Sequence, residues 1–157
     1  MTYSVKEMYY TLQGEGAHAG SACVFLRFAA CNLTCTWCDT DFRPDGAHTM
    51  SASEIVARLV ELDRDTSRLV IVTGGEPTLQ GELSAFCRGI KEMGYAVKID
   101  TNGSRPRIIQ NLIRESLVDY VAMDIKTDPA AYAPWITRDP DTGSVLTSIR
   151  LLMESQI

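Results

Sequence analysis

Three cysteines lie close together in one short polar segment of the chain. Cys31, Cys35 and Cys38 are separated by four and then three positions in the stretch CNLTCTWCDTDF. The residues between them are mostly polar, which is a poor composition for a buried core segment. In a reducing compartment, clustered thiols of this kind indicate a metal site rather than a disulfide framework.

The number of clustered thiols separates two kinds of metal site. A structural zinc site normally uses four protein ligands, and this segment reaches four only if His48 or Asp39 joins the thiols. Three thiolates can instead hold three irons of a 4Fe–4S cube and leave the fourth iron to a small chelating ligand. The spacing favours the iron–sulfur cluster, and the zinc site is the alternative.

A second motif, TGGEP, covers residues 73–77 and follows a short apolar run. Glycine has no Cβ, so a backbone with two glycines can approach a ligand closely. Alone, the motif is also typical of a plain turn between a strand and a helix.

The elements that must position these motifs alternate along the chain. Apolar runs at residues 22–29, 69–72, 95–103 and 118–126 predict strands, and residues 51–62, 79–94, 105–116 and 145–155 predict helices. Ser51 and Glu54 form a capping box, Pro106 suits a first helical turn, and Gly94 closes a helix. Right-handed strand–helix–strand units place the carboxyl ends of the strands on one rim. The cysteine segment, TGGEP, DTNG and MDIK should therefore meet there.

The fold class expected from this order is α/β, in the form of a partial (β/α) barrel with a parallel sheet and a single domain over residues 1–157. About four units are visible, whereas a full barrel of eight takes about 250 residues. The last residues, RLLMESQI, have a helical pattern and no stop signal. The expectation is either a fragment or a partial barrel truncated at its C-terminal end.

The composition does not suggest that the protein binds nucleic acid or a charged membrane surface. The net charge is −5 and charged residues make up 22% of the chain, which gives no support for binding nucleic acid or a membrane surface. The N-terminal MTYSVKEMYY lacks the pattern of a signal peptide, and no apolar run is long enough to span a bilayer. A cytoplasmic location is the expectation.

The C-x₃-C-x₂-C spacing followed by TGGEP resembles the radical S-adenosylmethionine (SAM) superfamily. The resemblance implies that Cys31, Cys35 and Cys38 hold a 4Fe–4S cluster whose open iron is chelated by SAM. It also implies reductive cleavage of SAM to a radical that abstracts hydrogen from a substrate. Further contacts with SAM are expected from the residues that match the family's motifs: Trp37, Cys38, Asp39, Gly75, Thr101, Asn102 and Lys126.

The first forty residues, with LQGEG and VFLRFAACNLTCTWCDT, closely resemble the 7-carboxy-7-deazaguanine synthase family. This implies a lyase that contracts 6-carboxy-5,6,7,8-tetrahydropterin to 7-carboxy-7-deazaguanine, with release of ammonia, for queuosine and archaeosine. It further implies a homodimer, an electron donor of the flavodoxin or ferredoxin type, and Mg²⁺ on Thr40. The residues matched to the pterin are Leu12, Gln13, Gly14, Arg27 and Thr73.

Several alternatives remain open from the sequence. The second half, from VKIDTNG to DPAAY, resembles activating enzymes of anaerobic ribonucleotide reductase, which act on a glycine in a partner protein. Arg27 could pair with Glu15 or Asp39 rather than a substrate, and Glu76 could orient the glycine turn or form a salt bridge. Packing roles are expected for the remaining residues singled out by type: Cys23, Cys87, Tyr132 and Trp135. DTNG could be only a turn, and Lys126 only a solvated lysine.

Overall fold

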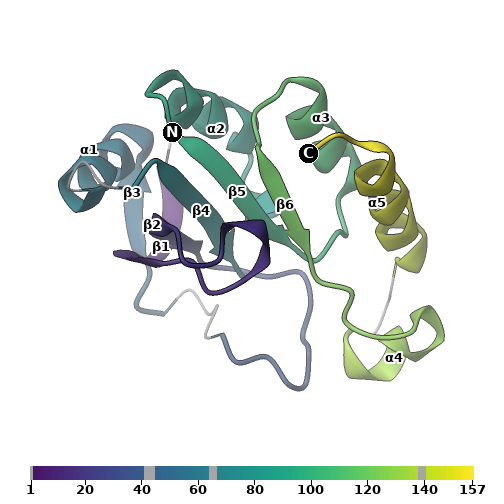
Figure 1. The fold of residues 1–157 in the computed structure, drawn as a ribbon. Helices are drawn as coiled ribbons and strands as arrows, with labels where there is room; N and C mark the ends of the chain where they lie inside the picture. The colour runs from purple at the N-terminus through teal and green to yellow at the C-terminus, as the bar shows by residue number, and fades with distance from the viewer. Residues whose placement is uncertain (1, 41–44, 64–66, 138–140) are drawn as a thin grey trace.

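The computed structural model describes residues 2–40, 45–63, 67–137 and 141–157, which form a six-stranded sheet with helices against it (Figure 1). The strand order is β3-β1-β2-β4-β5-β6. The strands are β1 (Thr2–Leu12), β2 (Ala22–Phe28), β3 (His48–Ser51), β4 (Leu69–Gly74), β5 (Ala96–Thr101) and β6 (Tyr120–Met123). The α-helices are α1 (Ala52–Asp63), α2 (Leu83–Glu92), α3 (Pro106–Arg114), α4 (Tyr132–Trp135) and α5 (Thr142–Glu154). Short 3₁₀ turns cover Gly16–His18, Pro77–Leu79 and Pro129–Ala131.

The parallel part of the sheet is the one that the sequence predicts. Strands β2, β4, β5 and β6 pair in parallel and in chain order. Strands β1 and β3 add an antiparallel edge that was not predicted. Neither segment has a clear strand pattern in its sequence. The sequence of β1 mixes charged and apolar residues without regular alternation, and β3 has only four residues, HTMS.

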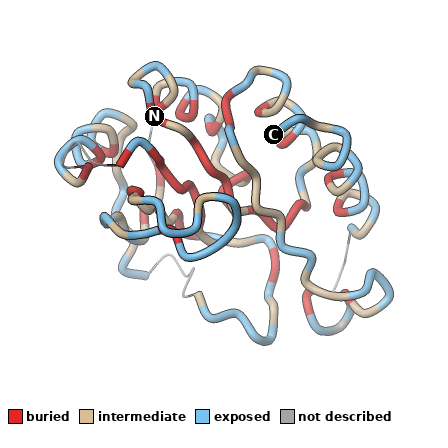
Figure 2. Tube along the Cα trace, in the orientation of Figure 1, coloured by how far each residue is buried: buried red, intermediate tan, exposed pale blue. Residues whose placement is uncertain are grey.

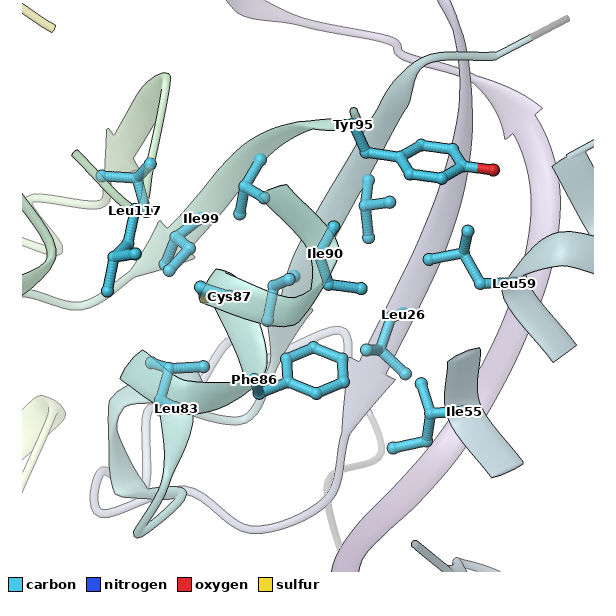
Figure 3. Packing of buried hydrophobic residues seen from close by; sticks show 14 of the residues in the cluster. Leu26, Ile55, Leu59, Leu83, Phe86, Cys87, Ile90, Tyr95, Ile99 and Leu117 are labelled. Carbon is cyan, nitrogen blue, oxygen red and sulfur yellow. The ribbon is translucent and has the colours of Figure 1, made fainter. Parts of the chain in front are cut away.

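The main core lies between one face of the sheet and the helices. Alternate side chains of β2 and β5, such as Leu26 and Ile99, belong to this core and are buried. Figure 2 shows buried positions along the central strands. Figure 3 shows Ile55 of α1 and Phe86 and Ile90 of α2 packed on the same side. The apolar runs of the sequence therefore form a helix-covered layer, as expected for α/β units.

Local signals place most helix ends correctly. Ser51 N donates to Glu54 Oε2 at 2.7 Å and Glu54 N donates to Ser51 Oγ at 3.2 Å, which confirms the capping box. The predicted start of the second helix at residue 79 is wrong, since α2 begins at Leu83. Residues 77–79 form a 3₁₀ turn instead, because Glu76 caps that turn through the backbone N–H of Thr78.

The two cysteines outside the cluster are core residues, as predicted. Cys23 and Cys87 are both fully buried. Burial raises the pKa of Cys87 to about 12. Neither thiol has the solvent access of a ligand or nucleophile.

The opposite face of the sheet is more polar. Cys23, Leu69 and Ile71 form a small apolar cluster there, and Lys98 is buried beside them with 1% exposure. Its ammonium group pairs with Asp100 and lies 3.8 Å from Glu15, in the turn after β1. That turn therefore crosses this face of the sheet (Figure 1).

The β4 end approaches the start of the cysteine segment at van der Waals distance. Gly74 has a φ of +143°, and a Cβ there would lie 2.2 Å from the carbonyl oxygen of Phe28. A Cβ on Gly75 would lie 2.0 Å from the carbonyl oxygen of Ala30 and 2.8 Å from Cys31 Cβ. Both glycines are required because backbone atoms, which cannot rotate away, occupy that space.

Substituting Gly75→Ala should destabilise the protein by about 1–3 kcal/mol, because the cysteine segment must move to admit the methyl group. Urea denaturation at neutral pH measures the change. Gly81→Ala is the matched control, since no atom lies within 4 Å of its Cβ position. Equal stabilities for the two variants would contradict the close contact.

A buried carboxylate ties the end of α1 to the start of β5. Asp63, 4% exposed, accepts hydrogen bonds from Ser67 N at 2.9 Å and from the Tyr95 hydroxyl at 2.6 Å. Burial alone would raise the pKa of Asp63, but the hydrogen bonds from Ser67 and Tyr95 outweigh it and lower the pKa. A carboxyl group whose pKa is lowered by folding stabilises the fold above its unfolded pKa, and this stabilisation is lost as the pH falls through the folded value.

Tyr95→Phe should therefore lower the free energy of unfolding by about 1.5–3 kcal/mol at neutral pH, because it removes a donor to a charged acceptor. The difference from the unmodified protein should narrow as the pH falls below the ordinary pKa of an aspartic acid, about 3.9, because protonation of the carboxyl group removes the charged acceptor. Urea titrations at neutral pH and at a series of acidic pH values test this. Tyr9→Phe, at a half-exposed ring that stacks on Phe25, is the control; a pH-independent loss in Tyr95→Phe would contradict the role of Asp63.

Candidate active site

The four motifs meet in one cavity at the carboxyl ends of the parallel strands. The cavity has a volume of about 350 Å³. The residues of the four motifs that line it are Cys31, Leu33, Cys35, Trp37, Cys38, Asp39, Thr40, Thr73, Gly74, Gly75, Asp100, Thr101, Asn102, Asp124 and Lys126. The rim expected from right-handed crossover connections is therefore present.

The three clustered thiols all line this cavity. Cys31 and Cys35 are partly buried, and burial raises the pKa of both thiols. In the part of the chain that the structure describes, no three cysteine, histidine or acidic side chains lie close enough to share one metal ion. His48 lies on β3, the edge strand on the far side of β1. The thiolates of a 4Fe–4S cube each bind a separate iron, so they need not converge on one ion.

The segment after β6 forms hydrogen bonds with the cysteine loop and packs against it. Thr34 N donates to the carbonyl of Ile136 at 2.9 Å, and Thr36 N donates to that of Trp135 at 3.2 Å. Leu33 packs in a small cluster of buried side chains with Tyr132, Ile136 and Val145. The packing role expected for Tyr132 is confirmed, whereas the Trp135 side chain is 55% exposed and does not line the cavity.

Glu76 is a fully buried carboxylate that holds two motifs together. It accepts hydrogen bonds from Thr78 N at 3.1 Å, Thr101 Oγ1 at 2.8 Å and Asn102 N at 2.7 Å. These contacts favour the orienting role over the salt bridge. They join the turn after β4 to the turn after β5.

Arg27 lies at the cavity wall, but its ion-pair partner differs from both alternatives. Its Nε is 2.6 Å from Glu7 Oε1. Among the described residues no ion pair joins Arg27 to Glu15 or Asp39, the two partners that the sequence suggested. Glu7 lies directly opposite Arg27 in the β1–β2 ladder, so the register of an unpredicted strand sets the pair. Arg27 Nη1 donates to Thr40 Oγ1 at 3.3 Å, which brings the predicted pterin and magnesium residues together.

The predicted SAM residues share the cavity with these groups. Trp37 and Asp39 line it, and the Trp37 ring is 53% exposed. Lys126 is not a solvated lysine: its side chain is 27% exposed and pairs with Asp124 at 2.6 Å. Partial burial alone would lower the pKa of Lys126, but Asp124 and the nearby thiols of Cys35 and Cys38 raise it.

Three predicted pterin residues do not line the cavity. Leu12 is 63% exposed, and Gly14 is exposed. Gln13 is buried, and its Oε1 accepts a hydrogen bond from Gly14 N at 3.1 Å. Its Nε2 is a buried donor that has no partner among the described residues. Residues 41 and 42, the end of the cysteine motif, lie outside the described residues.

Three carboxylates of the cavity were missed as site residues: Glu15, Asp100 and Asp124 all line it. The signal for Asp100 is its position two residues after Lys98 on β5, since residues two apart share one face of a strand. Glu15 belongs to the same QGEG element as Gln13, and the turn after β1 carries it over the polar face.

Comparisons with known proteins agree with this geometry. The chain is 40% identical over 129 residues to a 7-carboxy-7-deazaguanine synthase of Neisseria meningitidis serogroup B, covering 82% of this chain and 55% of that protein. It is 39% identical over 145 residues to the enzyme of the same name from Burkholderia multivorans, covering 82% of this chain and 65% of that protein. The chain thus spans only about half to two thirds of the length of these relatives.

Two solved structures share the fold. QueE from Escherichia coli superposes with a TM-score of 0.60 and 28% identity, over 66% of this chain and 54% of that one. TYW1 with a lysine–pyruvate adduct superposes with a TM-score of 0.60 over 84% of this chain and 52% of that one, at 13% identity. Among the described residues no helix has the length and apolar character needed to cross a bilayer. Because the Radical SAM superfamily model matches residues 26–157, from within β2 through the cysteine loop to α5, the chain belongs to the radical SAM superfamily.

Proposed function

We propose that this chain acts as a 7-carboxy-7-deazaguanine synthase, converting 6-carboxy-5,6,7,8-tetrahydropterin to 7-carboxy-7-deazaguanine with release of ammonia. The observation that carries the proposal is the shared cavity: the three thiols, the glycine turn, Arg27 and Thr73 all line it. The relatives of that name support the same reaction.

The cofactor roles follow from the donor set. Cys31, Cys35 and Cys38 would hold a 4Fe–4S cluster, and the backbone at Gly75, with Trp37 and Lys126, would bind SAM. When bound, the cluster and SAM together supply radical chemistry. The protein residues position the reactants and keep water from them.

The substrate contacts use groups with unused hydrogen-bonding capacity. Arg27 places Nε on Glu7 and Nη1 on Thr40, and Nη2 has no partner within the described residues. A guanidinium group can bind a carboxylate through two parallel hydrogen bonds. The unpartnered Nε2 of Gln13 is a second donor, and it would bind the pterin after a small movement of the turn that follows β1.

Magnesium would bind near Thr40. The Thr40 hydroxyl lies 3.2 Å from Asp39 Oδ1, and both residues line the cavity. Two oxygen atoms that could bind a metal ion therefore lie close together. Magnesium takes few protein ligands and completes its shell with water and substrate oxygens. We further propose a single domain, a homodimer, a cytoplasmic location and electron supply by a flavodoxin or ferredoxin.

The deciding experiment is anaerobic reconstitution with iron and sulfide, followed by incubation with SAM, Mg²⁺, a reductant and the pterin. Mass spectrometry should detect the deazaguanine product. Formation of 5′-deoxyadenosine alone would overturn the pterin proposal and point to the second candidate, hydrogen abstraction from a glycine in a partner protein.

Alanine at any one of Cys31, Cys35 or Cys38 should sharply reduce retention of iron and acid-labile sulfide, because only two thiolates then anchor the cluster. Elemental analysis after gel filtration measures this. Cys23→Ala and Cys87→Ala are matched controls because both thiols are buried away from the cavity. Full iron content in all three cluster variants would contradict the assignment.

Arg27→Gln should lower kcat/KM for the pterin by about tenfold or more, because a charge-assisted contact contributes about 1.5–3 kcal/mol. The slow cleavage of SAM without substrate should remain. Arg58→Gln on α1 is the control, since Arg58 forms an exposed ion pair with Glu61 and does not line the cavity. An unchanged kcat/KM in Arg27→Gln would contradict the carboxylate role.

A further inference from the structure

Asn102, in the turn after β5, places its side-chain amide beside a candidate cluster ligand. The residue is 5% exposed. Its Nδ2 lies 3.0 Å from Asn32 Oδ1 and 4.0 Å from Cys31 Sγ, the latter at the long end of the range for a sulfur acceptor. Its Oδ1 accepts a hydrogen bond from Ser104 N at 2.9 Å. Both ends of the amide are therefore used within the protein.

The orientation of this amide is fixed by its partners. The backbone N–H of Ser104 needs an acceptor, so the carbonyl oxygen of the amide must face it. The NH₂ group then faces Asn32 and Cys31. Asn32 Nδ2 in turn donates to Ser104 Oγ at 2.9 Å, which closes the network. A flipped amide would place donor against donor and leave buried groups unpaired, at a cost in free energy.

The backbone of Asn102 is held as firmly as its side chain. Its N–H donates to the buried carboxylate Glu76 at 2.7 Å. The next carbonyl, that of Gly103, accepts a hydrogen bond from Ser148 Oγ of α5 at 2.6 Å. The donor that faces the sulfur therefore belongs to a rigid part of the fold.

Cys31 differs from the other two clustered thiols in its hydrogen bonds. Its sulfur accepts from Leu33 N at 3.4 Å as well as from Asn102 Nδ2. Within the described residues, the sulfur of Cys35 is approached by its own backbone N–H alone, and no side-chain amide contacts the sulfur of Cys35 or Cys38; Cys38 Sγ lies 3.5 Å from the carbonyl oxygen of Thr40. Hydrogen bonds to ligand sulfurs raise the reduction potential of iron–sulfur clusters, because they stabilise the extra negative charge of the reduced form.

We propose that Asn102 is a positioning residue that raises the cluster's reduction potential through the sulfur of Cys31. Its amide serves the cluster, and its contact with SAM, expected from the sequence, is not the main role of the side chain. The inference rests on the proposed cluster at Cys31, Cys35 and Cys38. It goes beyond the proposed function because it names one side chain that contributes to the reduction potential of the cluster.

The test is a redox titration of reconstituted protein, with the reduced cluster followed by electron paramagnetic resonance. Dithionite supplies the single electron. Asn102→Leu, which keeps the branching and the number of heavy atoms of the side chain but has no donor, should have a more negative midpoint potential. At the midpoint of the unmodified protein, the ratio of reduced to oxidised cluster should fall about tenfold, which corresponds to about 59 mV for one electron.

Asn32→Ala is the matched control. It removes the neighbouring amide but leaves the contact between Asn102 and Cys31, so its midpoint potential should stay close to that of the unmodified protein. An unchanged potential in Asn102→Leu would overturn the proposal. Equal shifts in both variants would also overturn it, since general polarity would then explain the effect.

A measurement on the unmodified protein keeps the proposal testable if Asn102→Leu fails to fold. The chain has only three asparagines, at positions 32, 102 and 111. With ¹⁵N in the asparagine side chains alone, pulsed electron paramagnetic resonance of the reduced cluster should detect a coupled nitrogen. That coupling should disappear in Asn102→Asp, which has the same shape and still accepts from Ser104 N.

No coupled nitrogen in the unmodified protein would overturn the inference. Failure of the proposed function has a separate signature: a reconstituted protein that holds no iron and sulfide. A chain with a full cluster and no amide coupling would keep the cluster assignment and reject the role of Asn102.

Discussion

The close approach of two backbones at Gly75 determines where the cysteine loop can lie. The Gly75 N–H donates to the carbonyl of Phe28 at 3.2 Å, and the Glu76 N–H donates to that of Ala30 at 2.9 Å. These bonds form only because no Cβ separates the chains. The loop that carries Cys31 therefore begins at a fixed distance from the end of β4, before any metal binds.

The buried carboxylate of Glu76 extends this constraint to the next strand. Its hydrogen bonds to Thr101 and Asn102 align the ends of β4 and β5, so one side chain sets the relative position of two motifs. A buried carboxylate is costly unless its oxygens are hydrogen-bonded, and here they are. The hydrogen bonds that stabilise the buried carboxylate are thus the same ones that hold these two turns in place at the cavity.

The sequence predicts the parts of the fold that depend on local signals. The capping box at Ser51 and Glu54 and the apolar runs that became β2, β4, β5 and β6 are such signals. The cavity followed from them, because parallel strands with right-handed connections bring their carboxyl ends together. The residue types at those ends then indicated the chemistry.

What could not be predicted depends on contacts between distant segments. The partner of Arg27 is Glu7 because β1 pairs with β2 in one register, and a strand of mixed polarity does not reveal that register. The same holds for Glu15, which reaches the cavity because the turn after β1 crosses the sheet. The amide network of Asn32, Asn102 and Ser104 joins residues about 70 positions apart, which no local pattern encodes.

The lysine buried on the polar face of the sheet limits which amino-acid substitutions this cavity can accept during evolution. Lys98 is 1% exposed and is close to two carboxylates, Asp100 and Glu15. Loss of the lysine alone would leave Asp100 without its cation, and loss of Asp100 alone would leave a buried cation without its nearest partner. Glu15 is 74% exposed, so its contact with the lysine contributes little. Single substitutions at Lys98 or Asp100 are therefore disfavoured, and these two residues should be replaced together, as one inherited unit, when this cavity diverges.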